Sequence, residues 1–419
     1  MTAHDSGTGA RPHVVVINRW REHYAEYEQY IDHATHRVTY ISTEVGLGSV
    51  PSVATDTVLV DATDDIAEVR VAIAELVRRH GAPHRIVALK EDDLLVGAQL
   101  REDWGVPGQW TVDLVRFRDK YRMCQAVQAA GQRVPAFAAV SGPRAVLDFA
   151  DANGWPVVLK PRVGSSSAGV ELLNGPADLA EISFTDEPML VQAYNPHPIY
   201  HVDGLFTGRS MASLTVSRYV NTCLAFRTGT FLGSVEVDDH RIVDAVRTAA
   251  GGFLRALTNQ PTPVHLEVFI EVTLYGVTCT FLEVGARVGG AEIPFIWRDL
   301  HGYDLVRAAF DLQLCREPAG PPADAGRGEV GGWLLIPTPA QRPCRITEVT
   351  SMVGTKPGPY AEALLDVGEV LPDAAAYYEH VGGRFRFRGA TSAEVETAIV
   401  ATANGFRVNA EPVERVDAL

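Results

Sequence analysis

Several features that would assign a chain to a class at once are missing from this sequence of 419 residues. Its five cysteines are odd in number and lie far apart, without metal-ligand spacing, which predicts free thiols in a reducing cytoplasm. The N-terminus has no apolar signal core, and no window reaches the roughly 18 apolar residues of a membrane span. We therefore expect a soluble cytoplasmic protein with no membrane partner.

Positive charge is also scarce. The chain has 37 Lys and Arg against 52 Asp and Glu, a net charge of −15. Nucleic-acid phosphates would be repelled by this excess, so a nucleic-acid partner is not expected. Hydrophobic residues make up 46% and charged residues 21%, as in ordinary globular proteins, and the length predicts two or three domains.

The N-terminal region alternates between short apolar runs and helical patterns. The apolar runs are residues 13–18, 36–42, 56–62 and 84–90. Between the last two, Ile66, Val69, Ile73 and Val77 recur at helical spacing, and the polar segment 19–34 is also predicted to be a helix. This alternation predicts an open parallel α/β sheet. No G-x-G-x-x-G follows the first run, so no dinucleotide-binding fold is indicated.

Composition divides the rest of the chain. Glycine and proline cluster at 105–110 and again at 317–332, which marks boundaries. Residues 116–131 read as one amphipathic helix, and 392–405 as another. The expected divisions are a disordered leader (1–12), an α/β domain (13–110), a small lid subdomain with its preceding helix (111–195), a catalytic subdomain (196–316), and a linker with a C-terminal strand-rich subdomain (317–419).

The segment VVLKPRVGSSSAGV (157–170) is the most informative motif. An apolar strand brings Lys160 to a loop of small residues, where backbone N–H groups can approach an anion closely. A strand lysine beside such a loop suits a polyphosphate. An ordinary surface turn with an extended lysine is the alternative.

Two further strand patterns, VHLEVFI (264–270) and TFLEVGARVGG (280–290), each carry one glutamate among apolar residues. Period-two alternation places His265 and Glu267 on one face. If the strands are neighbours, Glu267 and Glu283 face a shared Mg²⁺, which takes oxygen ligands. The alternatives are structural salt bridges, for example between Glu283 and Arg287, and for His265 a packed or supporting histidine.

Three other elements complete the set. Lys120 stands at the start of a predicted helix and by itself reads as a surface lysine. The run MLVQAY (189–194) is an apolar strand that ends at a proline-rich segment, where exposed backbone groups suit an adenine edge. Arg287 follows Glu283 by four positions, and an arginine there can stabilise developing negative charge.

In this order the motifs resemble those of the ATP-grasp superfamily of carboxylate–amine ligases. The motifs that carry the resemblance are RDKYRMCQAVQAAGQRVP, VVLKPRVGSSSAGV, LVQAY, YHVDGLF, VHLEVF and FLEVGARVGG. The resemblance implies an α/β protein with an N-terminal open parallel domain, central α+β ATP-grasp domains with antiparallel sheets, and a C-terminal α+β extension. It also implies ATP and Mg²⁺ as cofactors, with Mn²⁺ as an alternative.

The resemblance assigns roles to individual residues. Lys120 and Lys160 are expected at the ATP phosphates and Arg287 at the acyl phosphate, with Glu267 and Glu283 as metal ligands. The remaining nucleotide contacts are expected from Ser165, Ser166, Ser167, Gln192, Ala193 and Tyr194.

Two positions depart from the family pattern. Gly285 stands where relatives have a metal-binding asparagine, so a second Mg²⁺ needs water or a neighbour such as Glu271. Ile199 replaces a glutamate that holds ribose, a role for which Asp203 or His201 could substitute.

The implied reaction activates a substrate carboxylate as an acyl phosphate and couples it to an amine. Among relatives the chain looks most like L-amino-acid ligases that form dipeptides or amide-containing secondary metabolites, enzymes in which a homodimer is common. The loop at 164–169 and the region 218–235 are candidate lids, and Arg218 and Arg227 are candidate anion contacts. A carboxylase, a purine-pathway ligase and a non-catalytic nucleotide-binding regulatory protein stay open as alternatives.

Overall fold

The computed structural model describes residues 11–20, 24–321, 328–373 and 381–413, so most of the expected leader lies outside the described residues. The chain forms two compact units, one of residues 1–115 with 306–319 and one of residues 116–305 with 320–419. Among the described residues, no helix is long and apolar enough to cross a membrane.

The first unit contains the predicted parallel sheet, with strand order β3-β2-β1-β4. Its strands are β1 (His13–Asn18), β2 (Arg37–Ser42), β3 (Asp56–Leu59) and β4 (Arg85–Ala88). Its other elements are α1 (Tyr27–Tyr30), η1 (Val45–Ser49), α2 (Ile66–His80), η2 (Glu91–Asp93), α3 (Leu94–Trp104) and α11 (Leu305–Gln313). The helix predicted from apolar spacing is α2, which begins where the Asp65 carboxylate accepts two backbone N–H groups.

Two predictions for this unit are wrong in part. Within the described part of segment 19–34 the only helix is α1, because the segment turns to bury aromatic side chains. The Tyr27 hydroxyl donates to Asn18 at 3.1 Å, and the Tyr27 and Tyr30 rings pack against Phe310. Phe310 belongs to α11, so residues 306–319 complete this unit although the sequence placed most of them in the catalytic subdomain.

A buried carboxyl group also lies in the first unit. Asp93 is fully buried and accepts a hydrogen bond from Thr63 Oγ1 at 2.9 Å. Burial raises the pKa of Asp93 to about 6. Nothing in the sequence pattern around residues 91–93 indicates that this carboxyl group leaves the solvent.

The second unit begins with a small antiparallel sheet of order β5-β8-β6-β7. Its elements are β5 (Phe137–Val140), α6 (Pro143–Asn153), β6 (Val157–Pro161), β7 (Glu171–Leu173), α7 (Pro176–Leu179) and β8 (Met189–Ala193). Its core packs Val146 and Phe149 of α6 against Val157, Leu159 and Val191 of the sheet. The motif lysine, Lys160, lies on β6.

The helix predicted over 116–131 is two helices, α4 (Thr111–Arg118) and α5 (Lys120–Ala129). Asp119 separates them with extended backbone, and its carboxylate accepts the N–H groups of Tyr121 and Arg122. Because an aspartate that caps a helix must leave helical geometry, the pattern of apolar spacing alone did not reveal this break. Lys120 is therefore the first residue of α5.

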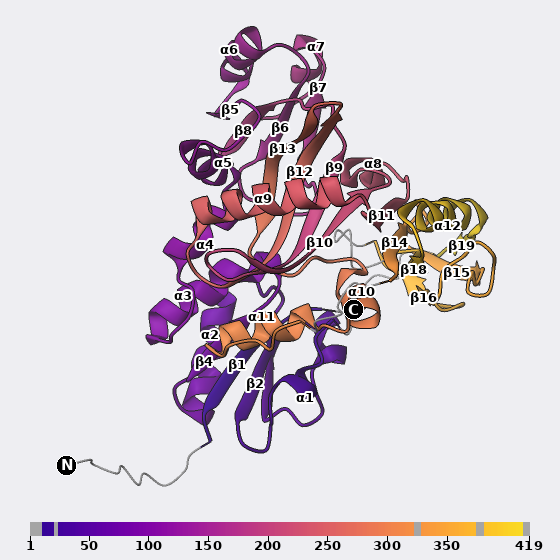
Figure 1. Cartoon of the computed structure of the whole chain (residues 1–419). Coiled ribbons are helices and arrows are strands. Elements are labelled where there is room, and N and C mark those ends of the chain that lie inside the picture. The colour runs from indigo at the N-terminus through magenta and orange to yellow at the C-terminus, as the bar shows by residue number, and fades with distance from the viewer. Residues whose placement is uncertain (1–10, 21–23, 322–327, 374–380, 414–419) are drawn as a thin grey trace. The chain divides into compact units, whose positions relative to one another are not determined.

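A large sheet of order β13-β12-β9-β10-β11-β14-β18-β16 forms the centre of the second unit. Its strands are β9 (Ile199–Phe206), β10 (Met211–Tyr219), β11 (Leu232–Glu236), β12 (Thr262–Thr273), β13 (Gly276–Gly285), β14 (Val330–Ile336), β16 (Ala361–Leu364) and β18 (Gly383–Gly389). The helix α9 (His240–Leu257) lies across one face of β9, β10 and β13 (Figure 1).

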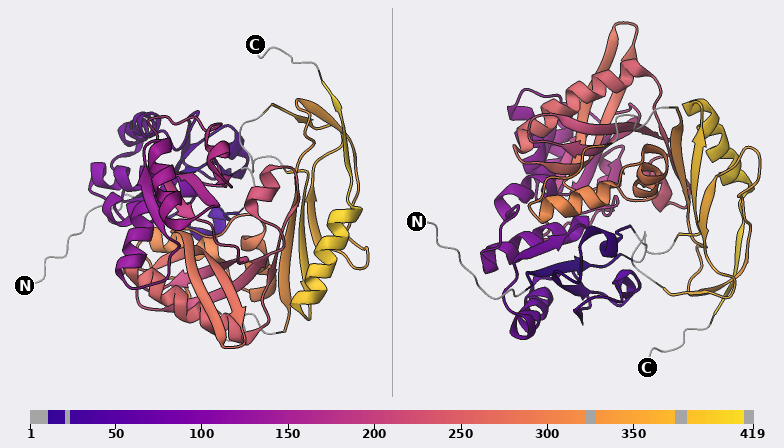
Figure 2. Two further views of the ribbon diagram at one scale, coloured as in Figure 1. Left: turned by 90° about the horizontal axis from the view of Figure 1, so that it is seen from above. Right: turned by 60° about the horizontal axis from the view of Figure 1, so that its bottom comes forward.

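The C-terminal strands β14, β16 and β18 extend this sheet, whereas the other C-terminal strands form a sheet of their own. The helix α12 (Ser392–Gly405) lies along β14 and β18 (Figure 2), and Ile399 packs there against Phe385 and Phe387. A further sheet has the order β17-β15-β19. The remaining elements are α8 (Cys223–Arg227), α10 (Ile293–His301), β15 (Cys344–Val349), β17 (Val370–Leu371) and β19 (Val408–Pro412). Part of the predicted linker, 322–327, lies outside the described residues.

Candidate active site

The two predicted metal ligands lie side by side. Glu267 of β12 is paired directly with Glu283 of β13. Phe281 of β13 packs against the Phe253 ring of α9 and is paired with Val268 of β12. Val268 directly follows Glu267 along β12, so the two side chains point to opposite faces of the sheet. Glu267 therefore points to the face of the sheet away from α9. The exposed fraction of the Glu283 side chain is 37%, so its carboxylate is open to a ligand.

The two lysines meet these carboxylates from different elements. Lys120 Nζ lies 3.6 Å from Glu283 Oε2 and donates to the Gly164 carbonyl at 2.9 Å. Lys160 is only 4% exposed, and this burial lowers its pKa, an effect that the Glu283 carboxylate opposes. Helix α5, strand β6 and the β12–β13 pair thus bring two cations and two carboxylates together, although 163 positions separate Lys120 from Glu283.

The loop of small residues stands next to this group in an unusual conformation. Ser166 and Ser167 have φ of 56° and 55°, and Gly169 has φ of 66°. Side chains other than glycine rarely adopt these angles, so the loop carries local strain. Arg227 Nη1 of α8 donates to the Ser166 carbonyl at 3.2 Å. The two segments predicted as lids, 164–169 and 218–235, therefore touch.

The predicted adenine strand ends with one polar group unused. The Gln192 side chain is 3% exposed, and its Nε2 is buried without a hydrogen-bond partner among the described residues. The N–H groups of Ala193 and Tyr194 already donate to the carbonyls of Ala136 and Pro156. Any backbone contact of Ala193 or Tyr194 with a ligand must therefore use other groups than these N–H donors.

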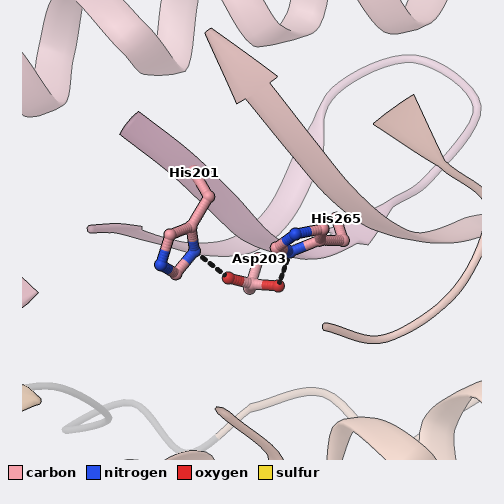
Figure 3. A group of neighbouring side chains, drawn as sticks. All are labelled: His201, Asp203 and His265. Atoms are coloured by element: carbon pink, nitrogen blue, oxygen red, sulfur yellow. Dashed lines mark hydrogen bonds and ion pairs between the residues drawn. The ribbon is translucent and has the colours of Figure 1, made fainter. Parts of the chain in front are cut away.

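A buried triad of His201, Asp203 and His265 lies on the strands β9 and β12, next to Glu267 (Figure 3). Asp203 Oδ2 is 2.6 Å from His201 Nδ1, and Asp203 Oδ1 is 2.8 Å from His265 Nδ1. Burial by itself raises the pKa of Asp203, but the two imidazoles hold it well below its usual range. Burial lowers the pKa of His265, yet the Asp203 carboxylate outweighs this and raises it to about 9.

These contacts correct the expectation that Asp203 or His201 holds ribose. Both carboxylate oxygens of Asp203 are used by histidines, and His201 Nε2 lies 2.6 Å from Ser234 Oγ. Although the ligand atoms of His201, Asp203 and His265 lie close enough to surround an ion, these mutual hydrogen bonds already use them. We interpret the triad as structural support for the sheet face that carries Glu267.

Support for Glu267 comes from a residue that the sequence reasoning missed. The Tyr219 hydroxyl donates to Glu267 Oε1 at 2.7 Å, and His265 Nε2 lies 3.8 Å from the same oxygen. Burial opposes ionisation of Glu267, but these two neighbours keep its pKa below the usual value. Tyr219 ends strand β10, and no pattern in the surrounding sequence indicates this contact.

Three other residues named in the sequence analysis are Arg287, Arg218 and Glu271, and the structure shows the position or contacts of each. Arg287 Nη1 donates to the Val288 carbonyl at 3.1 Å, and its charge acts on His265. Arg218 pairs with Glu396 at 2.6 Å, so the expectation of an anion contact is not supported there. Glu271 lies four residues beyond Glu267, roughly 13 Å along the strand, which is too far for it to replace the ligand missing at Gly285.

Comparisons with known proteins agree with this architecture. No protein-family model matches the chain. An L-arginine-specific L-amino acid ligase of Bacillus subtilis is 21% identical over 274 residues, a match that spans 62% of this chain and 64% of that relative, less than two thirds of its length. The crystal structure of an L-amino acid ligase from Bacillus licheniformis superposes with a TM-score of 0.74 at 15% identity, covering 96% of this chain and 99% of that one. The chain has the ATP-grasp fold.

Enzymes that are named for other reactions have a fold similar to that of this chain. Phosphoribosylglycinamide synthetase from Anaerococcus prevotii superposes with a TM-score of 0.66 at 11% identity over 95% of this chain and 99% of its own. Likeness at this level describes the fold alone.

Proposed function

We propose that this protein is an ATP-dependent, ADP-forming ligase that activates a carboxylate, that of an amino acid, and couples it to an amine. The observation that carries the proposal is the meeting of Lys120, Lys160, Glu267 and Glu283 at one place from four different elements. Two cations and two hard oxygen donors at one site suit a metal-bound polyphosphate.

The residues present fit the two groups that such a reaction needs. Glu267 and Glu283 are the residues that would hold Mg²⁺, with Mn²⁺ as an alternative, and the ion would supply positive charge against the transferring phosphoryl group. The buried Nε2 of Gln192 is a donor that an adenine nitrogen can satisfy. Gly285 adds no side-chain ligand, so this pair of carboxylates fits one well-held ion better than two.

The protein groups act mainly by position and charge. Lys120 and Lys160 would offset negative charge on the phosphates, and Arg287, whose charge acts on His265, would stabilise the acyl phosphate. The substrate carboxylate attacks the γ-phosphorus, ADP leaves, and the amine then displaces phosphate from the acyl phosphate. Because acyl phosphates hydrolyse, the Arg227 contact with the loop at Ser166 supports closure against water.

The choice of amino acids as substrates rests on the relatives. One is named as an L-arginine-specific L-amino acid ligase and the other as an L-amino acid ligase. A dipeptide is therefore the product that we propose, while the framework shared with phosphoribosylglycinamide synthetase keeps other carboxylates in the test.

The decisive experiment measures ADP and phosphate release with MgATP against a matrix of amino-acid pairs, and separately against bicarbonate and formate. We expect release only when a carboxylate and an amine are both present, with an amide product detected by mass spectrometry. Stimulation by bicarbonate or formate alone favours the carboxylase or purine-type alternative. Binding of ATP without stimulation by any pair favours a regulatory protein.

A matched pair of variants tests the site itself. Glu283→Gln removes a metal carboxylate and is expected to abolish turnover while the protein stays folded, because the side chain is partly exposed. Glu271→Gln changes the same residue type on the neighbouring strand, at a 44% exposed position, and is expected to keep normal activity. Near-normal turnover of Glu283→Gln contradicts the metal assignment.

A further inference from the structure

Two cationic side chains hold the loop of small residues that connects β6 to β7. The Gly164 carbonyl accepts a hydrogen bond from Lys120 Nζ at 2.9 Å, and this lysine lies 3.6 Å from the metal carboxylate of Glu283. Two positions further on, the Ser166 carbonyl accepts a hydrogen bond from Arg227 Nη1 at 3.2 Å. Ser166 has a φ of 56°, which serine rarely adopts, so the surroundings must hold this backbone in place.

Helix α8 connects Arg227 with the other metal carboxylate, Glu267. The helix begins at Cys223 and ends at Arg227, and it lies beside β11 (Figure 1). The Cys223 thiol is hydrogen-bonded to Tyr219, and the Tyr219 hydroxyl donates to Glu267 Oε1 at 2.7 Å. Burial raises the pKa of Cys223, so this side chain stays a neutral thiol that can donate to the tyrosine oxygen.

The geometry of α8 allows a displacement at one end to reach the other. Cys223 and Arg227 are four positions apart, so they lie on the same face of the helix with their Cβ atoms about 5–6 Å apart. Thr222 Oγ1 accepts the Ala225 N–H at 3.1 Å, and the Ala225 carbonyl accepts two further backbone N–H groups. Phe226 is 2% exposed and anchors the helix in the core. A turn bonded in this way moves as one body.

We propose that Cys223 and Arg227 are positioning residues that couple the metal site, through α8, to closure of the loop at 164–169. When Glu267 holds an ion, Tyr219 and α8 are fixed, and Arg227 keeps the loop closed. When Glu267 is empty, the same contacts break more easily and the loop opens more often. This inference rests on the nucleotide and metal sites of the proposed function and adds a regulation to them, because ATP without its metal ion does not close the loop.

Coupling of this kind is reciprocal. If metal binding favours the closed loop, then a contact that favours the closed loop raises the affinity for the metal by the same factor. A change at Arg227 should therefore reduce the contribution of Mg²⁺ to nucleotide binding, although Arg227 lies at the opposite end of α8 from Cys223. If Arg227 only held the loop, its loss would weaken nucleotide binding equally with and without Mg²⁺.

The experiment measures by calorimetry how much Mg²⁺ tightens the binding of ADP to the full chain, so it needs no turnover. The measured quantity is the ratio of Kd for ADP without metal to Kd for MgADP. Arg227→Gln is expected to lower this ratio about threefold, and Tyr219→Phe about tenfold. If both side chains act along one path, the double variant also lowers the ratio about tenfold, whereas independent effects multiply to about thirtyfold.

Three further measurements separate coupling from a structural defect. Hydrogen–deuterium exchange of the amides 163–170 should slow when Mg²⁺ is added to the ADP-bound parent, and should slow much less in Arg227→Gln and Tyr219→Phe. Cys223→Ser keeps a hydrogen-bond donor beside Tyr219 and should retain the parent ratio, whereas Cys223→Ala should lower it about threefold. Arg144→Gln, the same substitution at an 84% exposed arginine of α6, is the control and should change neither measurement.

The outcomes distinguish the coupling from the ligase function. If Arg227→Gln weakens ADP equally with and without Mg²⁺, or if the double variant reaches about thirtyfold, the coupling through α8 is wrong and the ligase function is untouched. If no amino-acid pair stimulates ADP release while Arg227 and Tyr219 affect the ratio as expected, the ligase function fails and the coupling stands. If Mg²⁺ does not tighten ADP binding in the parent, the coupling and the metal assignment are both wrong.

Discussion

Replacement of Gly289 by alanine should damage the site through one close contact. A Cβ at this position would clash with Asp203 Oδ1, and it would lie 2.6 Å from Ile293 Cδ1 and 3.0 Å from His265 Nδ1. The isoleucine is the end of a flexible side chain and can move. The Asp203 carboxylate cannot move without breaking its bonds to two histidines, because the triad is buried.

The expected magnitude follows from these contacts. Overpacking a buried site costs about 1–3 kcal/mol. Loss or lengthening of one charged hydrogen bond of Asp203 costs a further ~1.5–3 kcal/mol. Allowing for partial relaxation, we expect Gly289→Ala to lower the free energy of unfolding by about 2–4 kcal/mol, which in a domain of this size lowers Tm by about 4–8 °C.

The neighbouring glycine provides a matched control. A Cβ on Gly290 has no heavy atom within 4 Å, so Gly290→Ala should be close to neutral. The assay is differential scanning calorimetry of both variants, together with the Mg²⁺ concentration for half-maximal ADP release, which should rise for Gly289→Ala as His265 and Glu267 shift. Equal Tm values for the two variants would refute the reasoning, because the close contact is what distinguishes these positions.

Three further predictions concern other contacts. Tyr219→Phe removes the hydroxyl that orients Glu267 and should raise the Mg²⁺ concentration for half-maximal activity about tenfold. The circular dichroism spectrum of this variant should be normal. An unchanged Mg²⁺ titration contradicts the orienting role of Tyr219. The pKa of buried Asp93 is about 6 in the folded protein and 3.8 in the unfolded chain, so the folded state binds more protons between these values. The free energy of unfolding should therefore fall by about 3 kcal/mol as the pH rises from about 4 to about 6. In urea unfolding, Asp93→Asn should flatten this part of the pH profile, whereas a slope equal to the parent's excludes this group as the cause. The partly exposed Arg218–Glu396 pair should couple by only about 0.2–1 kcal/mol in a double-mutant cycle at low salt, and a much larger coupling energy contradicts its description as a solvated surface contact.

Local pattern was sufficient for much of the fold. The helix from Ile66 to His80 and the strands of the parallel sheet were predicted from apolar spacing, because each buries one face or both against its neighbours. The pattern failed where a polar residue overrides it. Asp119 caps α5 and interrupts a helical repeat, and the segment after Asn18 turns so that Tyr27 and Tyr30 can reach Phe310.

The candidate site also contains some residues whose role could be predicted from the sequence and others whose role could not. Glu267 and Glu283 could be predicted as a pair, since each is a lone carboxylate in an apolar strand and such a residue needs a cation. The role of Asp203 could not be predicted, because an aspartate near the site reads as a ligand contact until both of its oxygens are seen to bond His201 and His265. Tyr219 was missed for the converse reason, since a strand-end tyrosine carries no distinctive signal.

The sequence by itself determined which residue types are available for phosphate and metal chemistry, because lysines beside small-residue loops and isolated strand carboxylates are recognisable locally. Only the tertiary structure decided which of them meet. Lys120 of α5 reaches Glu283 of β13, and strand pairing brings Glu267 of β12 directly beside Glu283. Register and helix packing between segments far apart in the chain set these distances, and no local pattern of residues encodes them.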